Sequence, residues 1–210
     1  MSIVVHHLEE SRSQRVLWLL EELGLPYEVR RYERNAQTRL APPELKAIHP
    51  LGKSPLIERD CRVFAESGAI VEYFAESEGG GRLAVPAGDP ARAEYLYWLH
   101  FAEGSAMLPL LLKLYVGLLG EAGAPLMAAR IEPEIASHLA HADAALGESN
   151  HFVANRFTAA DIQMSFVLDA ARGRGGLENY PNLMRARAAN QARPAYRRAL
   201  ERGGPYKMGQ

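Results

Sequence analysis

The opening segment of the chain, residues 3–32, constrains the fold most strongly because its hydrophobic spacing changes twice. Residues 3–8 form a short, β-branched run bounded by charged residues, which predicts a buried strand. Apolar residues at helical spacing follow over residues 16–23, and Gly24 is placed to end that helix. Residues 26–32 alternate and predict a second strand. This order implies a parallel pair of strands joined by a right-handed crossover.

The α/β pattern continues for another forty or so residues. Residues 42–48 predict a short helix with proline in its first turn, residues 56–64 a hairpin, and residues 67–77 a further helix. The predicted order is therefore strand, helix, strand, helix, strand, strand, helix. We assign residues 1–78 to one compact α/β domain.

The remainder of the chain predicts a second, all-α domain. Residues 79–89 are rich in glycine and proline and are typical of a linker. After them we find no convincing strand, and we assign residues 90–210 to an all-helical domain. Its first helix is expected over residues 91–119 with a kink at Pro109, and its second is expected to be interrupted at Pro133.

Two local patterns stand out within the helical domain. Thr158 and Asp161 have the spacing of a capping box at a helix start. Arginine is frequent towards the C-terminal end, and we interpret these arginines as a solvated face rather than a polyanion site. They are Arg185, Arg187, Arg193, Arg197, Arg198 and Arg202.

Composition limits the classes of partner. The formal net charge is −1, which argues against a nucleic-acid-binding surface built on bulk electrostatics. Cys61 is the single cysteine, so we expect no intrachain disulfide and no cysteine-rich metal site. The chain has no basic-then-apolar leader and no apolar run long enough to cross a bilayer, so we expect a cytoplasmic protein with no membrane partner and no metal.

The stretch from His49 to Ile57 is the first candidate for a ligand site. It contains a Pro-x-Gly turn and a second proline, Pro55, at the mouth of an apolar run. An X-Pro bond is the one place where a cis peptide costs little, and a cis bond here would present the backbone of Ser54 to a ligand. Lys53 beside it is either a solvated surface charge or a partner for a ligand carboxylate.

Two helix starts supply further candidates. Ser11 and Gln14 have capping-box spacing, yet a capping hydroxyl still has one proton to donate, and a helix N-terminus favours a thiolate. Glu66 and Ser67 precede an apolar helix and are either an exposed acid and a cap, or a clamp for an ammonium and a carboxylate. One ligand with a thiol, an amine and a carboxylate at each end would use all of these groups. Glutathione is such a molecule.

With these motifs in place, the sequence resembles the cytosolic glutathione transferases over essentially its whole length. The resemblance implies a thioredoxin-like N-terminal domain, a cis bond before Pro55, a glutathione site on that domain, and a homodimer. The matching segments are residues 11–24, residues 49–55, residues 66–70 and residues 158–162.

The resemblance also implies which group activates the thiol. Ser11 would donate a hydrogen bond to the glutathione thiolate, with Ser13 and Arg12 as rivals for that position. No tyrosine precedes Tyr27 and no cysteine lies near Ser11, so the serine-type branch of the family, as in bacterial and fungal members, is favoured over the tyrosine and cysteine types.

The remaining binding roles are implied in the same way. The backbone of Ser54, ahead of cis Pro55, would pair with the cysteinyl unit of glutathione. Lys53 would meet the glycyl carboxylate, while Glu66 and Ser67 would hold the γ-glutamyl end.

The expected activity is conjugation of glutathione, as co-substrate, to small hydrophobic electrophiles in detoxification, with possible peroxidase activity. Two alternatives stay open: a non-catalytic interaction module on the same fold, and a glutathione-dependent isomerase or dehalogenase. The electrophile pocket is expected on the first helix of the second domain, although plain helical core is the better explanation of any one candidate taken singly. The candidates are Met107, Leu108, Leu111 and Tyr115.

Overall fold

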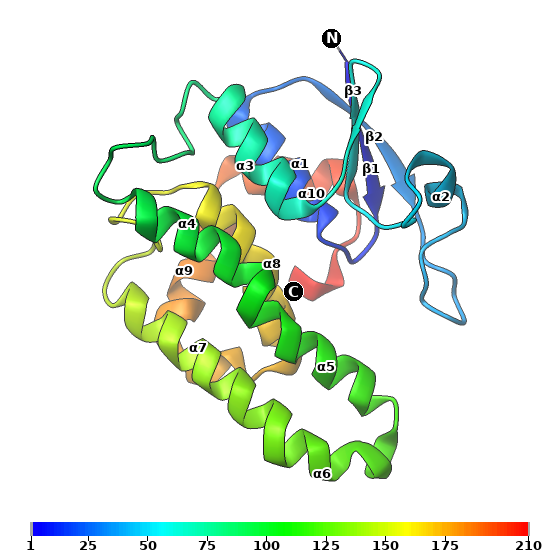
Figure 1. Ribbon diagram of the computed structural model, residues 1–210, viewed down its shortest axis with the longest axis vertical. Helices are drawn as coiled ribbons and strands as arrows, with labels where there is room; N and C mark the ends of the chain where they lie inside the picture. Colours follow the sequence, from blue (N-terminus) through cyan, green and yellow to red (C-terminus); the bar gives the residue numbers. More distant parts are fainter. Residues whose placement is uncertain (1, 210) are drawn as a thin grey trace. The chain divides into compact units, whose positions relative to one another are not determined.

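The computed structural model describes residues 2–209. Contacts divide the chain into two compact units (Figure 1): one consists of Met1–Ala84 with Gln191–Gln210, and the other of Val85–Asn190. The predicted linker, residues 79–89, contains this boundary. The last twenty or so residues belong with the first unit, whereas the sequence pattern grouped them with the helical domain.

The first unit is built on a small mixed sheet. Its strands are β1 (Ile3–Leu8), β2 (Tyr27–Tyr32), β3 (Leu56–Arg59) and β4 (Arg62–Phe64), in the order β2-β1-β3-β4. Strands β1 and β2 are parallel, and β3 runs antiparallel to both β1 and β4. The predicted parallel pair and hairpin are confirmed, and the arrangement is a thioredoxin-like α/β domain.

Four helices accompany this sheet. Helix α1 (Ser13–Leu23) contacts β1, α3 (Ser67–Ser77) and α10 (Pro194–Gly203), and these three helices lie together on one side of the sheet in Figure 1. The short α2 (Glu44–Ile48) lies on the other side. Helix α1 ends as predicted at Gly24, whose φ of 69° is the left-handed conformation that glycine adopts without a Cβ clash.

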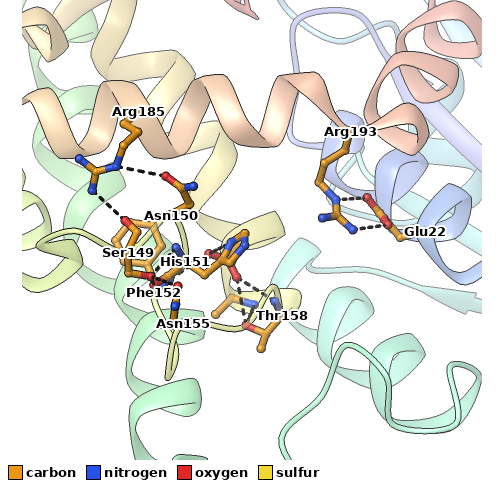
Figure 2. A network of polar contacts seen from close by, with 11 residues as sticks. Glu22, Ser149, Asn150, His151, Phe152, Asn155, Thr158, Arg185 and Arg193 are labelled. Atoms are coloured by element: carbon orange, nitrogen blue, oxygen red, sulfur yellow. Dashed lines mark hydrogen bonds and ion pairs between the residues drawn. The ribbon is translucent and has the colours of Figure 1, made fainter.

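Ion pairs attach the C-terminal segment to α1. Arg193 donates to both oxygens of Glu22 at 2.6 and 2.9 Å, as Figure 2 shows, and Arg198 donates to Glu21 at 2.7 Å. Tyr196 packs edge-on against Trp18, with ring centroids 5.1 Å apart. The interpretation as a solvated face is therefore wrong for the half-buried, paired Arg193, whereas Arg197, Arg198 and Arg202 are exposed.

The second unit is helical. Its main helices are α4 (Arg92–Phe101), α5 (Met107–Gly117), α7 (Glu132–Leu146), α8 (Ala159–Arg174) and α9 (Pro181–Ala192). Helix α8 is buried along most of its length and contacts both α4 and α5. Over residues 2–209 no helix is long and apolar enough to cross a membrane.

Arginines in this unit are also used internally. Arg185 donates to Asn150 and to the carbonyls of Gly147 and Ser149, which holds the end of α7 and the loop after it (Figure 2). Arg187 donates to the buried Asp169 at 2.9 Å. Hydrogen bonds to charged groups of this kind are worth about 1.5–3 kcal/mol where they are buried.

Both prolines inside the predicted helices follow a widened turn. A π-helical segment, Ala102–Ala106, precedes Pro109, and a second one, Met127–Ile131, lies between α6 (Ala124–Leu126) and Pro133. A proline lacks an N–H and crowds the carbonyl four residues before it, and in each case that carbonyl lies inside the π segment. The helix expected over 91–119 is therefore interrupted at residues 102–106, ahead of Pro109 itself.

The predicted capping box at the start of α8 is confirmed. The Thr158 hydroxyl accepts a hydrogen bond from the backbone N–H of Ala160, and the Asp161 carboxylate accepts one from the backbone N–H of Thr158 at 2.8 Å. The other carboxylate oxygen of Asp161 accepts from the N–H of Phe152 at 3.0 Å. This buried aspartate therefore fixes both the helix start and the preceding loop.

Candidate active site

Ser11 and Ser13 form a buried pair where β1 passes into α1. The hydroxyl oxygens are 2.8 Å apart, and the Ser11 hydroxyl also accepts from the backbone N–H of Ser13 at 3.2 Å. Ser11 is 6% exposed and Ser13 is fully buried, so Ser11 is the one nearer to the surface. The turn between β1 and α1 thus leaves Ser11 as the more exposed member of the pair.

The capping box predicted for Ser11 and Gln14 is wrong. Neither amide atom of the buried Gln14 side chain has a hydrogen-bond partner among the described residues. The side chain is directed towards α10 instead, because its oxygen lies 3.1 Å from the position that a Cβ on Gly203 would take. The N-cap position of α1 is Arg12, and the contribution of Ser11 is limited to the bond that its hydroxyl accepts from the N–H of Ser13.

Ser13 is connected to a histidine that the sequence analysis missed. Its hydroxyl oxygen lies 2.8 Å from Nδ1 of His7 and donates to the carbonyl of Leu8 at 3.2 Å. Burial and the positive charge of Arg31 lower the pKa of His7 to about 4, although a hydrogen bond with the backbone of Gly203 raises it. His7 is therefore neutral at physiological pH. The available signal was a polar residue on a buried strand that leads directly into the helix of Ser11.

The loop before β3 is attached to the same strand end. The Ser54–Pro55 peptide bond is cis. The Ser54 hydroxyl donates to the carbonyl of His6 at 2.8 Å and accepts from the N–H of Leu8 at 3.2 Å. The two backbone groups of Leu8 therefore bind Ser54 on one side and Ser13 on the other, which brings the two predicted motifs together.

Lys53 lies at the exposed edge of this loop. Its side chain forms no ion pair with any residue from 2 to 209. The preceding Gly52 has a φ of 57°, and a Cβ there would lie 2.6 Å from Cγ of Lys46, so only glycine fits. The left-handed conformation of Gly52 therefore determines the shape of the turn that exposes Lys53.

Glu66 and Ser67 form the start of α3. Glu66 is exposed and has the unusual φ of 67° for a residue other than glycine, a conformation that is found at functional sites more often than elsewhere. Ser67 is buried, and its hydroxyl accepts from Nη1 of the buried Arg15 at 3.3 Å. Arg15 therefore connects the first turn of α1 to the first turn of α3.

The remaining candidates behave differently from one another. Arg12 is half-buried at the N-cap position of α1 and makes no side-chain cap there. Met107 on α5 is buried in the helical core, whereas Leu108 and Tyr115 are 55% and 58% exposed and Leu111 is half-buried. The four α5 residues therefore do not share one surface. No group of three or more His, Cys, Asp or Glu side chains within the described part of the chain could hold a metal ion.

The sheet order, the loop with the cis proline and the helix starts around the end of β1 define a thioredoxin-like domain followed by a helical one. The family model described as "Glutathione S-transferase, N-terminal domain" matches residues 11–77. Glutathione S-transferase 1 of Saccharomyces cerevisiae is 34% identical, over 85% of this chain and 86% of its own length. The chain therefore belongs to the glutathione S-transferase family.

Solved structures of the same family are also similar to this chain. A glutathione S-transferase from Actinobacillus pleuropneumoniae superimposes with a TM-score of 0.89 at 32% identity, over 99% of this chain and 96% of that one. A family member from Pseudomonas fluorescens, solved with two glutathione molecules bound, gives a TM-score of 0.79 at 29% identity over 95% of this chain and 92% of that one. Both likenesses extend over the two units, so the family resemblance is not confined to the first.

Proposed function

We propose that this protein conjugates glutathione to small hydrophobic electrophiles and that the Ser11 hydroxyl donates a hydrogen bond to the glutathione thiolate. The observation that carries this proposal is the position of that hydroxyl. It lies at the start of α1, is held from behind by the N–H of Ser13, and is the outer member of the serine pair. A donor fixed in advance where negative charge develops needs no reorganisation during the reaction.

The magnitudes are sufficient for thiol activation. A hydrogen bond to a charged group contributes about 1.5–3 kcal/mol, and a helix N-terminus about 0.3–1 kcal/mol for a nearby anion. Together they supply about 2–4 kcal/mol, which lowers a thiol pKa from about 8.5 by about 1.5–3 units. The bound thiol would then be substantially ionised near neutral pH.

Support for Ser11 over Ser13 comes from the number of protons available. A serine hydroxyl has one proton, and that of Ser13 lies within reach of two buried acceptors, Nδ1 of His7 and the carbonyl of Leu8. A thiolate would therefore compete with two internal acceptors for the Ser13 proton.

Glutathione itself would be bound by the groups around the end of β1. Lys53 would pair with the glycyl carboxylate, and the backbone of Ser54, beside Pro55, would pair with the cysteinyl unit. Glu66 would accept from the α-ammonium group, and the N–H of Ser67 at the start of α3 would meet the α-carboxylate. The exposure of Lys53 and Glu66 supports these roles, because both charges are accessible to a ligand.

The electrophile would contact apolar side chains of α5, for which the exposed Leu108 and Tyr115 and the half-buried Leu111 are the best candidates. The burial of Met107 favours a core role for that residue. Peroxidase activity, a homodimeric state, a cytoplasmic location and a part in detoxification belong to the same proposal.

The test is glutathione binding by calorimetry together with ultraviolet titration of the bound thiol. Ser11→Ala is expected to raise the pKa of the bound thiol by about 1–2 units and to leave the affinity for glutathione nearly unchanged. Ser137→Ala is the control, because that hydroxyl only donates to the carbonyl of Glu134 within its own helix. Absence of binding at millimolar glutathione would favour the non-catalytic interaction module, and an effect from Ser13→Ala in place of Ser11→Ala would reverse the two serines.

A further inference from the structure

Three side chains form a continuous hydrogen-bonded chain from the interior to the candidate active site. Nδ1 of His7 lies 2.8 Å from the hydroxyl oxygen of Ser13, which lies 2.8 Å from the hydroxyl oxygen of Ser11. All three residues are buried, with exposed fractions of 3% for His7, 0% for Ser13 and 6% for Ser11. The direction in which the protons point along this chain decides which serine can donate to a ligand.

The inner end of the chain determines that direction. His7 also hydrogen bonds with the backbone of Gly203 on α10, and it is Nε2 that lies near Gly203, 3.3 Å from the position a Cβ there would take. The bond raises the pKa of His7, as a carbonyl acceptor does. Nε2 therefore carries the proton of the neutral ring, and Nδ1 is an acceptor.

The rest follows from counting protons. If Nδ1 is an acceptor, the single proton of Ser13 lies between two internal acceptors, Nδ1 of His7 at 2.8 Å and the carbonyl of Leu8 at 3.2 Å, and Ser13 then offers Ser11 only an acceptor. The proton of Ser11 is the only hydroxyl proton of the pair that can turn outward without breaking a bond to His7. Burial and the positive charge of Arg31 on β2 lower the pKa of His7 to about 4, so the ring stays neutral at physiological pH and Nδ1 remains available as an acceptor.

We propose that His7 is a positioning residue of the transferase reaction: as the nearer of two internal acceptors for the hydroxyl proton of Ser13, beside the carbonyl of Leu8, it makes Ser11 the thiolate donor and keeps Ser13 from taking that role. The inference rests on the proposed function of Ser11 and adds the reason why one serine of the pair is selected. No bond is made or broken by His7, which acts only on the orientation of two hydroxyl groups.

The first experiment uses the unaltered protein without ligand. Nitrogen-detected NMR of the imidazole reports which ring nitrogen carries the proton. We expect Nε2 of His7 to be protonated and Nδ1 to be bare at pH 7. A proton on Nδ1 would overturn the inference, because His7 would then donate to Ser13 instead of accepting from it. This measurement does not depend on glutathione binding or on the folding of any variant.

The second experiment is a double substitution. In Ser11→Ala, Ser13 cannot replace the missing donor while its proton is bound to His7. Adding His7→Leu removes the nearer of the two acceptors of that proton and leaves only the carbonyl of Leu8 at 3.2 Å. We therefore expect the pKa of bound glutathione in the double variant to be lower than in Ser11→Ala alone, by about half a unit to one unit. If His7 had only a structural role, a second substitution beside the site would raise the pKa of the bound thiol further or leave it unchanged.

His6→Leu in the Ser11→Ala background is the matched control. His6 is also buried and lies next to His7 in β1, but its ring nitrogens form hydrogen bonds with Tyr32 and Glu58 on the other face of the sheet. We expect no recovery from this variant. Failure of the proposed function would appear earlier, as wild-type protein that does not bind glutathione or as Ser11→Ala that leaves the thiol pKa unmoved. If instead the wild type binds glutathione and Ser11→Ala raises the thiol pKa, but the His7 double variant behaves as the His6 one, only the inference about His7 is overturned.

Discussion

The candidate site has two parts that differ in how much of their bonding capacity the fold already uses. The serine pair at the end of β1 is buried, and every hydroxyl there has a protein partner. Lys53 and Glu66 at the rim are exposed, and neither side chain forms an ion pair with another residue of the described chain. The difference suggests a division of work in which the interior fixes the chemistry in advance, while the rim keeps its charges available to a charged ligand.

The largest expected effect tests the buried part through pH. Because the pKa of His7 is lowered from 6.5 to about 4 in the folded protein, the unfolded chain binds more protons between those two values. The free energy of unfolding should therefore fall as the pH drops from about 6.5 to about 4, by roughly 3 kcal/mol from this residue. Urea unfolding of the wild type and of His7→Leu across this window measures the contribution. Equal slopes in the two proteins would contradict the burial argument.

The next effect is kinetic. Ser11→Ala should lower kcat/KM by about 10- to 150-fold at pH 6.5, because it removes a hydrogen bond of about 1.5–3 kcal/mol that is strongest to the thiolate. The loss should become smaller as the pH rises above the thiol pKa of the variant, because ionisation is then complete without help. A standard electrophile assay over pH 6–9 checks both points. A loss that stays constant across this range would place Ser11 outside thiol activation.

Substitutions at the rim should change the affinity for glutathione rather than the turnover number. Lys53→Ala is expected to weaken glutathione binding by about 5-fold, or about 1 kcal/mol, since exposed ion pairs contribute little and are screened by salt. The difference between wild type and variant should shrink at high ionic strength, which calorimetry at two salt concentrations can measure. Lys207→Ala, an exposed lysine at the C-terminal end of the same unit, is the control. A fall in kcat with unchanged affinity would break the proposed division between rim and interior.

The smallest effect is expected at the opposite rim position. Glu66→Gln keeps the size of the side chain and removes its charge, so its affinity loss should be at or below that of Lys53→Ala. The bound thiol pKa should not change, because the carboxylate would contact the far end of glutathione. A shifted thiol pKa in this variant would show that the two parts of the site are coupled.

Local patterns predicted much of the fold because the forces concerned act over a few residues. The strand–helix–strand start, the hairpin at residues 56–64 and the capping box of Thr158 and Asp161 all depend on neighbours in the sequence. Pro109 and Pro133 were recognised as interruptions for the same reason, although the widened turns lie ahead of them. The candidate residues Ser11, Ser54 and Ser67 followed from helix starts and an X-Pro bond, which are likewise local features.

Long-range pairing was beyond such patterns. Arg193 pairs with Glu22 and Arg198 pairs with Glu21, and in each case the two residues are more than 170 positions apart. No local pattern around either residue indicates its partner. Gln14 fits a capping box by spacing, yet α10 and Gly203 draw its side chain away from the helix start. A spacing rule cannot include a helix that arrives from the other end of the chain.

The sequence by itself determined the succession of elements and the two serines that can donate, because hydrophobic periodicity and helix capping are written in adjacent residues. Only the tertiary structure decided which serine faces outward and what holds the other one. That choice depends on His7, which is neutral because strand β1 is buried beneath α1 and α10, and on the backbone of Gly203, which reaches the ring only after α10 has packed. Burial and the meeting of distant segments set the direction of a hydrogen bond, and no run of residues encodes either one.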